Sequence, residues 1–431
     1  MIIFKKVKSR KQAQRYKEKI QMTGKVDKHI LKNGMVLLGE LMESVQSVAF
    51  GFMLPAGAAM LPEGCCGAGN IIVDWMFRGA GSRNSRQLGD ALDGLGLNRD
   101  SSVNSSHLGI GAVLEAGNLA DAIELYADVI LKPHLKEDQF ELARQLAIEE
   151  VLALDDEPRQ KVMAKVREQF YPHPLGRSTE GKVDELKALT AEETKQIVEK
   201  YFNLSQTIFS VAGKYDFDAI CRQMERLFET GPQKPLKPIR HGSKGNRYSH
   251  IHNESAQVHI GLMTETVRPA DEDYYNARIA VSILSGGMSS RLFTEVREKR
   301  GLCYAVGARY HNLKEAAGIA CYAGTTPEKA QETLDLIIAE FIRLSKGIKE
   351  EELQRAKVGL KSALILQSES SSSRAGSIAG DYYILGRVRS LDEIKNKIDE
   401  TTVGSVLSFL RKNRFKDFTV VTIGPKQLTV R

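Results

Sequence analysis

The chain of 431 residues repeats itself at an offset of about 210 residues, and this repeat constrains its fold more than any other feature. The matching pairs are residues 48–53 (VAFGFM) and 258–263 (VHIGLM), residues 175–177 and 385–387 (both LGR), and residues 211–213 (VAG) and 422–424 (TIG). Chance could supply one such match. Several matches in the same order at nearly one offset indicate two halves that share one fold.

The two halves predict the same order of secondary structure. Each begins with an apolar, alternating segment typical of a strand, continues with a helix and further strands, and then has two long helical patterns and a closing strand. The predicted ranges are 45–54, 71–77 and 208–212 in the first half, and 256–264, 275–284 and 418–423 in the second. Hairpin-like strand pairs mixed with helices favour an α+β fold of two homologous α/β sandwich halves, each a mostly antiparallel sheet covered by helices.

A segment rich in proline, glycine and lysine separates the halves. Residues 231–238 read GPQKPLKP and have no apolar periodicity, which is typical of a linker. The predicted domains are a basic N-terminal arm (1–26), a first α+β domain (27–230), a linker (231–247) and a second α+β domain (248–431). Lysines and arginines in the arm could serve an anionic partner, a membrane surface or a mitochondrial presequence, but a solvated helix or frayed tail is favoured.

Composition excludes several classes of protein. Hydrophobic residues make up 42% and charged residues 27% of the chain, as in ordinary globular proteins. No apolar run is long enough for a membrane span, and no aromatic-rich signature of nucleic-acid binding accompanies the basic residues. The five cysteines are odd in number and scattered, which fits reduced thiols, so a cytoplasmic location is expected.

Two segments carry a resemblance to a known family. Residues 67–79 read GAGNIIVDWMFRG, and residues 286–304 read GGMSSRLFTEVREKRGLCY. The first is similar to the helix of pitrilysin/insulinase-type zinc peptidases, in which His-x-x-Glu-His precedes Met-x-Phe-Lys-Gly, and the second closely resembles a segment from that family's second half. Weaker matches at 140–150 and 172–176 follow the same order. The chain resembles the branch of the mitochondrial processing peptidase, from about residue 30 onward.

This resemblance implies a degenerate zinc site. In the family, two histidines four residues apart share one helix face and bind Zn²⁺, the motif glutamate acts as general base, and a distal glutamate completes the ligands. Here Asn70 and Asp74 stand at the histidine positions, Val73 at the base position, and Glu150 at the distal position. We therefore expect no metal, no cofactor and no peptidase activity from this site, with zinc only in an active partner. An all-oxygen set could still favour a harder cation, or these side chains could be a hydrogen-bonded remnant.

The second-half segment retains more of the family pattern. The resemblance implies that Arg297 and Tyr304 face the zinc half and help to hold the backbone of a substrate. The alternative is structural, with Arg297 paired to an acidic neighbour and Tyr304 at the start of a strand. The sequence favours neither interpretation over the other.

Other candidates are weaker. Cys65 and Cys66 are adjacent, lack the spacing of a zinc-binding pair, and are expected to be loop or core residues. His107, His134 and His173 are isolated in sequence, and no pattern assembles them into a site. The serines at 370–373 are expected to form a loop or begin a helix.

Three functions follow as hypotheses. The preferred one is a pseudoenzyme: the non-catalytic subunit of a zinc metallopeptidase heterodimer, which helps an active homologous subunit to bind extended peptides or unfolded proteins along a sheet edge. The alternative is a non-proteolytic peptide-binding or scaffolding homodimer. A third is an active enzyme with an unorthodox metal. The short loop at 284–288 lacks the long glycine-rich insertion of the mitochondrial non-catalytic subunit, so presequence recognition is not expected.

Overall fold

The computed structural model describes residues 26–228, 236 and 238–430. Within them, the first half (26–228) contains a six-stranded sheet in the order β1-β2-β8-β3-β7-β6. Its strands are β1 (Val26–Ile30), β2 (Val36–Leu41), β3 (Ser47–Leu54), β6 (Asn98–Val103), β7 (Leu108–Glu115) and β8 (Ile208–Gly213), with a small ribbon of β4 (Gly79–Ala80) and β5 (Arg83–Asn84). Its helices are α2 (Ala68–Met76), α3 (Ser85–Gly94), α4 (Leu119–Leu131), α5 (Glu137–Ala153), α6 (Pro158–Phe170), α7 (Val183–Ala188), α8 (Ala191–Tyr201) and α9 (Phe217–Leu227).

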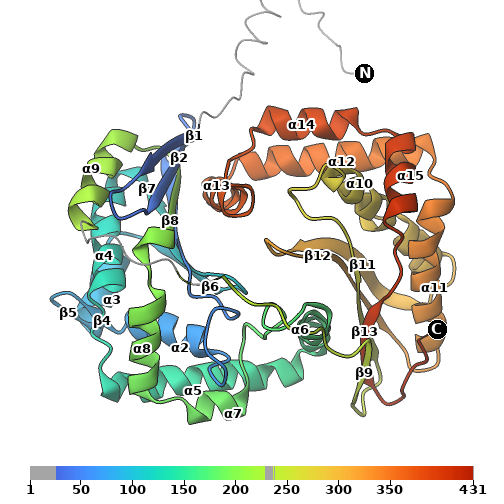
Figure 1. The fold of residues 1–431 in the computed structure, drawn as a ribbon, viewed down its shortest axis with the longest axis horizontal. Helices are drawn as coiled ribbons and strands as arrows, with labels where there is room; N and C mark the ends of the chain where they lie inside the picture. The colour runs from blue at the N-terminus through green and yellow to red at the C-terminus, as the bar shows by residue number, and fades with distance from the viewer. Residues whose placement is uncertain (1–25, 229–235, 237, 431) are drawn as a thin grey trace, which may run out of the picture.

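The second half (238–430) contains a five-stranded sheet in the order β11-β12-β10-β13-β9. Its strands are β9 (Tyr248–His252), β10 (Val258–Glu265), β11 (Cys303–Asn312), β12 (Ala317–Thr325) and β13 (Thr419–Gly424). Its helices are α10 (Tyr274–Ser285), α11 (Ala330–Arg343), α12 (Glu350–Ser368), α13 (Ser371–Leu385), α14 (Leu391–Glu400) and α15 (Val403–Lys412). Figure 1 shows the halves side by side, with most helices on the outside.

The sheets confirm the internal repeat and the α+β class. The central order β8-β3-β7-β6 of the first sheet matches β13-β10-β12-β11 of the second. Each sheet is antiparallel except for one parallel pair, β2 with β8 and β9 with β13. The sequence therefore predicted the two-sheet architecture correctly, including its mostly antiparallel character.

Separate apolar cores hold each sheet to its outer helices. In the first half, Phe50 on β3 contacts the ring of Tyr126 on α4 edge to face at 4.9 Å, and Phe209 on β8 lies beside both Phe50 and Phe52. In the second half, Phe341 on α11 contacts Phe418 at 5.5 Å. Burial of apolar side chains, aliphatic as well as aromatic, is the main stabilising contribution expected in each half.

One helix of each half covers the sheet of the other half. Helix α6 buries Val162, Val166 and Phe170 against Met263 and Val421 of the second sheet. Helix α13 buries Ile378 and Ala379 against Leu38 and Ile208 of the first sheet, and Ala375 lies against Ala49 and Ala212. Figure 1 shows both helices between the halves. The two halves are thus joined by a reciprocal exchange that the periodicity of the sequence did not reveal.

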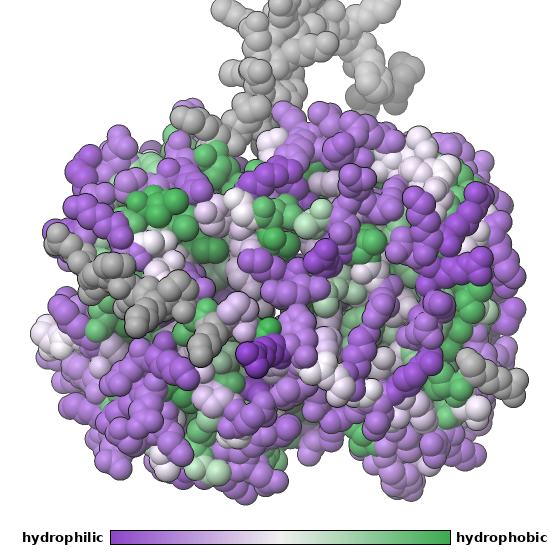
Figure 2. Space-filling view, in the orientation of Figure 1, coloured by the Kyte–Doolittle hydropathy of each residue, from purple (hydrophilic) through white to green (hydrophobic). Residues whose placement is uncertain are grey.

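Two of the predicted domain limits, those of the arm and of the linker, can be compared with the described residues. Val26, which the prediction placed in the basic arm, is the first residue of β1; the rest of the arm lies outside the described residues, as do 231–235 and 237 of the linker. The division at 231–247 stays a prediction. No helix within the described ranges is long and apolar enough to cross a membrane. Figure 2 shows mainly hydrophilic side chains on the visible face, with hydrophobic ones in smaller groups.

Candidate functional site

The position of helix α2 is set by burial of its apolar side and by a close contact at its first residues. Ile71, Ile72 and Trp75 are fully buried, and the Trp75 indole N–H donates to the carbonyl of Lys136 at 2.8 Å. The helix begins after Gly67, whose φ of 94° is in the left-handed region. A Cβ at Gly67 would lie 2.8 Å from the Cα of Gly181, so glycine allows the loop 178–181 to approach the start of α2.

Asn70 and Asp74 lie one turn apart on the remaining side of α2, and both already have partners. The Asn70 amide nitrogen donates to the carbonyls of Thr179 and Glu180, at 2.9 and 3.0 Å. The Asp74 carboxylate accepts from the guanidinium of Arg78 on the next turn. The first side chain anchors a loop, and the second pairs with an arginine just beyond the end of the helix, so both have structural roles.

A cavity of about 670 Å³ joins these residues to α5 and to the edge of the first sheet. Asn70, Val73 and Asp74 line it from α2, Glu150 lines it from α5, and residues 99–103 line it from β6. The predicted positions of the degenerate site are thus brought together. Strand β6 is the last strand of its sheet, so one of its backbone edges has no neighbouring strand within residues 26–228, 236 and 238–430.

The chemistry of this donor set does not fit zinc. Zinc sites use imidazole, thiolate and carboxylate ligands, whereas an asparagine amide is a poor ligand and valine offers none. Among the described residues, no group of three or more histidine, cysteine, aspartate or glutamate side chains is arranged to hold a metal ion. Val73 also cannot accept a proton from water. We therefore assign no catalytic step to these residues.

Arg297 and Tyr304 lie together, but in a different place. Arg297 belongs to the short helical turn Phe293–Glu298, and its guanidinium lies 4.8 Å from the ring centre of Phe293 and 5.4 Å from that of Tyr304. Tyr304 is the second residue of β11 and is 83% exposed. Within the described part of the chain, Arg297 forms no ion pair. The structural alternative is therefore right about Tyr304, which lies at the start of a strand. It is wrong about Arg297, for which the described residues provide no acidic partner.

The arginine lines a second cavity of about 670 Å³, between α6 and β11. Glu180 connects the two cavities, because its backbone carbonyl accepts from Asn70 while the residue lines the second cavity. The structure thus places Asn70, Val73, Asp74 and Glu150 around one cavity and Arg297 beside the other.

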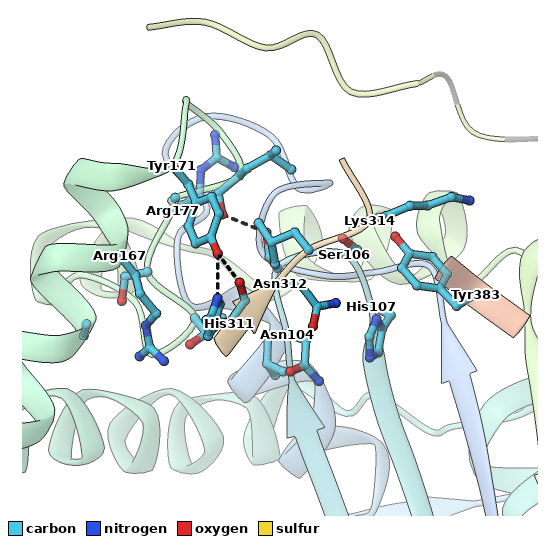
Figure 3. A pocket seen from close by; sticks show the side chains of 18 of the residues that line it. Asn104, Ser106, His107, Arg167, Tyr171, Arg177, His311, Asn312, Lys314 and Tyr383 are labelled. Atoms are coloured by element: carbon cyan, nitrogen blue, oxygen red, sulfur yellow. Dashed lines mark hydrogen bonds between the residues drawn. The ribbon is translucent and has the colours of Figure 1, made fainter. Parts of the chain in front are cut away.

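A third cavity, of about 230 Å³, lies where the two halves meet, and the sequence did not predict it. Figure 3 shows Tyr171, the residue that follows α6, pointing towards His311 at the end of β11, with its hydroxyl 2.7 Å from Nδ1. His107 lies beside Tyr383 of α13, 5.6 Å between ring centres, and its buried Nδ1 has no hydrogen-bond partner among the residues that the structure describes. Burial lowers the pKa of both histidines to about 4, which favours neutral rings.

The remaining candidates are structural. Cys66 is buried, and its thiol donates to the carbonyl of Ser178, while Cys65 is partly buried in the same loop. Burial raises the pKa of the Cys66 thiol to about 11, so it is not a reactive thiolate. His134 contacts the carbonyl of Gly81, and His173 contacts Glu63. The loop or core role expected for the cysteines is confirmed, and Ser370 is the residue that caps the start of α13.

The fold has two domains, each with a sheet covered by helices, and comparison with known proteins identifies its family. The chain matches the family described as Insulinase (Peptidase family M16) over residues 38–183, and Peptidase M16 inactive domain over residues 188–360. It therefore belongs to the M16 peptidase family, with matches that run through both halves.

Relatives and solved structures match the chain along nearly their whole length. The chain is 26% identical over 402 residues to an uncharacterized zinc protease of Rickettsia felis, covering 92% of this chain and 97% of the relative. It is 24% identical over 407 residues to the uncharacterized zinc protease YmxG of Bacillus subtilis, covering 93% and 98%. A solved M16 inactive-domain structure from Pseudomonas fluorescens superposes with a TM-score of 0.84 at 19% identity, covering 94% and 99%. A chain of complex III2 from Candida albicans gives 0.81 at 18% identity, covering 93% and 96%.

Proposed function

We propose that this chain is the non-catalytic subunit of a zinc peptidase heterodimer. The observation that carries the proposal is the contrast between the two halves. On α2, Asn70 and Asp74 are engaged in structural contacts and Val73 replaces the base. On the second half, Arg297 and Tyr304 lie together, and Tyr304 is largely exposed. Retention of the Arg297–Tyr304 pair in a chain whose metal-site residues are replaced supports an assisting role.

An extended peptide is the ligand class that this arrangement favours. Strand β6 lies at the edge of the first sheet and borders the cavity that contains Asn70 and Glu150. Main-chain groups at such an edge can pair with an added strand. Arg297 supplies guanidinium donors and Tyr304 a hydroxyl, which can bind carbonyl oxygens of the same peptide. Zinc and the general base would come from a homologous subunit with an intact His-x-x-Glu-His motif.

The test is reconstitution with such a subunit from the same organism. The kcat/KM of the mixture for a fluorogenic peptide is compared with that of each chain alone. We expect hydrolysis to rise when this chain is added, and to rise less when the added chain carries Arg297→Ala. A mixture no faster than the partner alone would reject the heterodimer. Peptide binding by a homodimer of this chain, seen by light scattering and anisotropy, would instead support the scaffolding alternative.

A further inference from the structure

The cavity between α6 and β11 is lined by an unusual concentration of positive charge. Of the described residues that line it, four are arginines (Arg159, Arg167, Arg297 and Arg309) and one, Glu180, is a carboxylate. Arg159 lies 5.0 Å from the ring centre of Tyr322, and Arg297 lies 5.4 Å from that of Tyr304. Within the described residues, none of the four arginines forms an ion pair. This set is called the arginine cavity below.

The hollow follows from small side chains on one face of β11. Ala305, Gly307 and Arg309 alternate on the face that α6 covers, as their register with Tyr322 and Ala320 of β12 shows. Because Ala305 and Gly307 have a small side chain or none, they leave space between this face of β11 and α6. Arg309 follows at the next position on the same face. Helix α6 contributes Arg159 and Arg167 from the opposite wall, two turns apart.

Four guanidinium groups around one cavity favour an anionic occupant. Arginine stays charged at any physiological pH, so like-charge repulsion within the cavity cannot be relieved by proton loss. Its planar donors match a carboxylate in a two-bond geometry. The cavity beside β6 has more acidic than basic residues in its lining, namely three carboxylates (Asp74, Asp100 and Glu150) and one arginine (Arg99). A peptide that spans both cavities would therefore meet a mainly acidic lining and a mainly basic one.

We propose that the arginine cavity binds glutamate or aspartate side chains of a bound peptide. This inference rests on the proposed peptide-binding function and adds the class of substrate to it. The arginines attract the acidic side chains of the peptide towards α6 and β11, and the carboxylates beside β6 repel them. Arg159, Arg167 and Arg309 thereby determine specificity, next to Arg297.

The experiment measures binding of three fluorescein-labelled peptides to the full chain by fluorescence anisotropy. The peptides have equal length and differ only at three positions, which are all glutamate, all glutamine or all lysine. We expect the glutamate peptide to bind about tenfold more tightly than the glutamine peptide, equivalent to about 1.4 kcal/mol, and the lysine peptide to bind more weakly than either. Raising the salt concentration should reduce the difference.

Variants locate the effect. The combined Arg159→Gln and Arg309→Gln variant should reduce the glutamate-to-glutamine preference to below about threefold, whereas Arg309→Lys should retain most of it. Arg86→Gln is the matched control, because Arg86 is exposed on α3, outside the cavity. Equal binding of the glutamate and glutamine peptides overturns the inference but leaves peptide binding intact. Failure of all three peptides to bind overturns both proposals. Displacement of the glutamate peptide by single-stranded RNA at lower concentration than by its unlabelled form would assign the cavity to another class of ligand.

Discussion

Arg374 of α13 and Glu40 of β2 form a buried ion pair between the two halves. The Arg374 Nη2 donates to Glu40 Oε2 at 2.5 Å, and Nε lies 3.0 Å from both carboxylate oxygens. Their side chains are only 7% and 6% exposed, although the residues are 334 positions apart in sequence. The exchange of helices thus places a charged contact, as well as apolar ones, in the middle of the interface.

Removing one partner of this pair should destabilise the protein strongly. Glu40→Gln leaves the Arg374 guanidinium buried beside a neutral group, and the expected loss in the free energy of unfolding is about 3–5 kcal/mol. Replacing both residues with apolar ones of similar volume, as in Glu40→Leu with Arg374→Met, should be less harmful than the single change. Urea unfolding monitored by circular dichroism measures this. The control Arg387→Gln breaks a more exposed pair with Glu393, and should change the stability by less than about 1 kcal/mol.

Restoring the family motif on α2 should create a zinc site. The variant Asn70→His, Val73→Glu, Asp74→His places two histidines on the helix side that shares a cavity with Glu150. We expect metal analysis of the dialysed protein to give close to one zinc per chain, against none for the unchanged chain. Adding Glu150→Gln to the variant should lower the zinc content. A folded triple variant that binds no zinc would show that the carboxylate of Glu150 is not placed as a ligand.

Arg297 and Tyr304 should matter for binding and not for stability. Because Tyr304 is largely exposed, Tyr304→Ala should lower the affinity for an extended peptide about three- to tenfold and leave the melting temperature nearly unchanged. Arg297→Lys keeps the charge but loses the planar contact with the two rings, so it should behave more like Arg297→Ala than like the unchanged chain. Anisotropy titration and differential scanning calorimetry separate the two effects. Parallel losses of affinity and melting temperature would indicate a structural role instead.

Acid should weaken the contact between the halves through His107 and His311. Their pKa values are lowered to about 4 by burial, and for His311 also by Arg167 and Arg309. Between pH 6.5 and about 4 the unfolded chain binds more protons at these sites than the folded chain, so stability falls as pH falls, by on the order of 2–3 kcal/mol for each histidine. Urea midpoints measured from pH 7 to 5 should therefore decrease. His107→Gln should make that slope shallower, whereas substitution of the exposed His252 should not.

The sequence predicted the elements of the fold better than their contacts. The repeat at 48–53 and 258–263 marks β3 and β10, which occupy equivalent places in the two sheets. Apolar periodicity reports that α6 and α13 have buried faces, but it does not report which sheet each face meets. The exchange of these helices depends on pairings between distant residues, such as Phe170 with Met263, that leave no local pattern.

The site shows the same limit. The residue types at 70, 73 and 74 are read directly from the sequence, and the structure places them beside Glu150. The carbonyls that accept hydrogen bonds from Asn70 belong to a loop more than 100 residues away in sequence. This contact depends on the close approach of Gly67 and Gly181, which the sequence does not show. The arginine cavity was also missed, because its members come from α6, from the turn at 293–298 and from β11. Only Arg297 belonged to a recognisable motif.

The position of α13 also has a consequence during synthesis of the chain. When the ribosome has translated the first half, every strand of the first sheet has been synthesised. The helix that covers Leu38 and Ile208, however, consists of residues 371–385 and is synthesised much later. One apolar surface of that sheet must stay uncovered while about 150 further residues are translated, at roughly 5–20 residues per second. The nascent chain is then exposed to aggregation for on the order of ten seconds or more, and it is a candidate for chaperone binding during that interval.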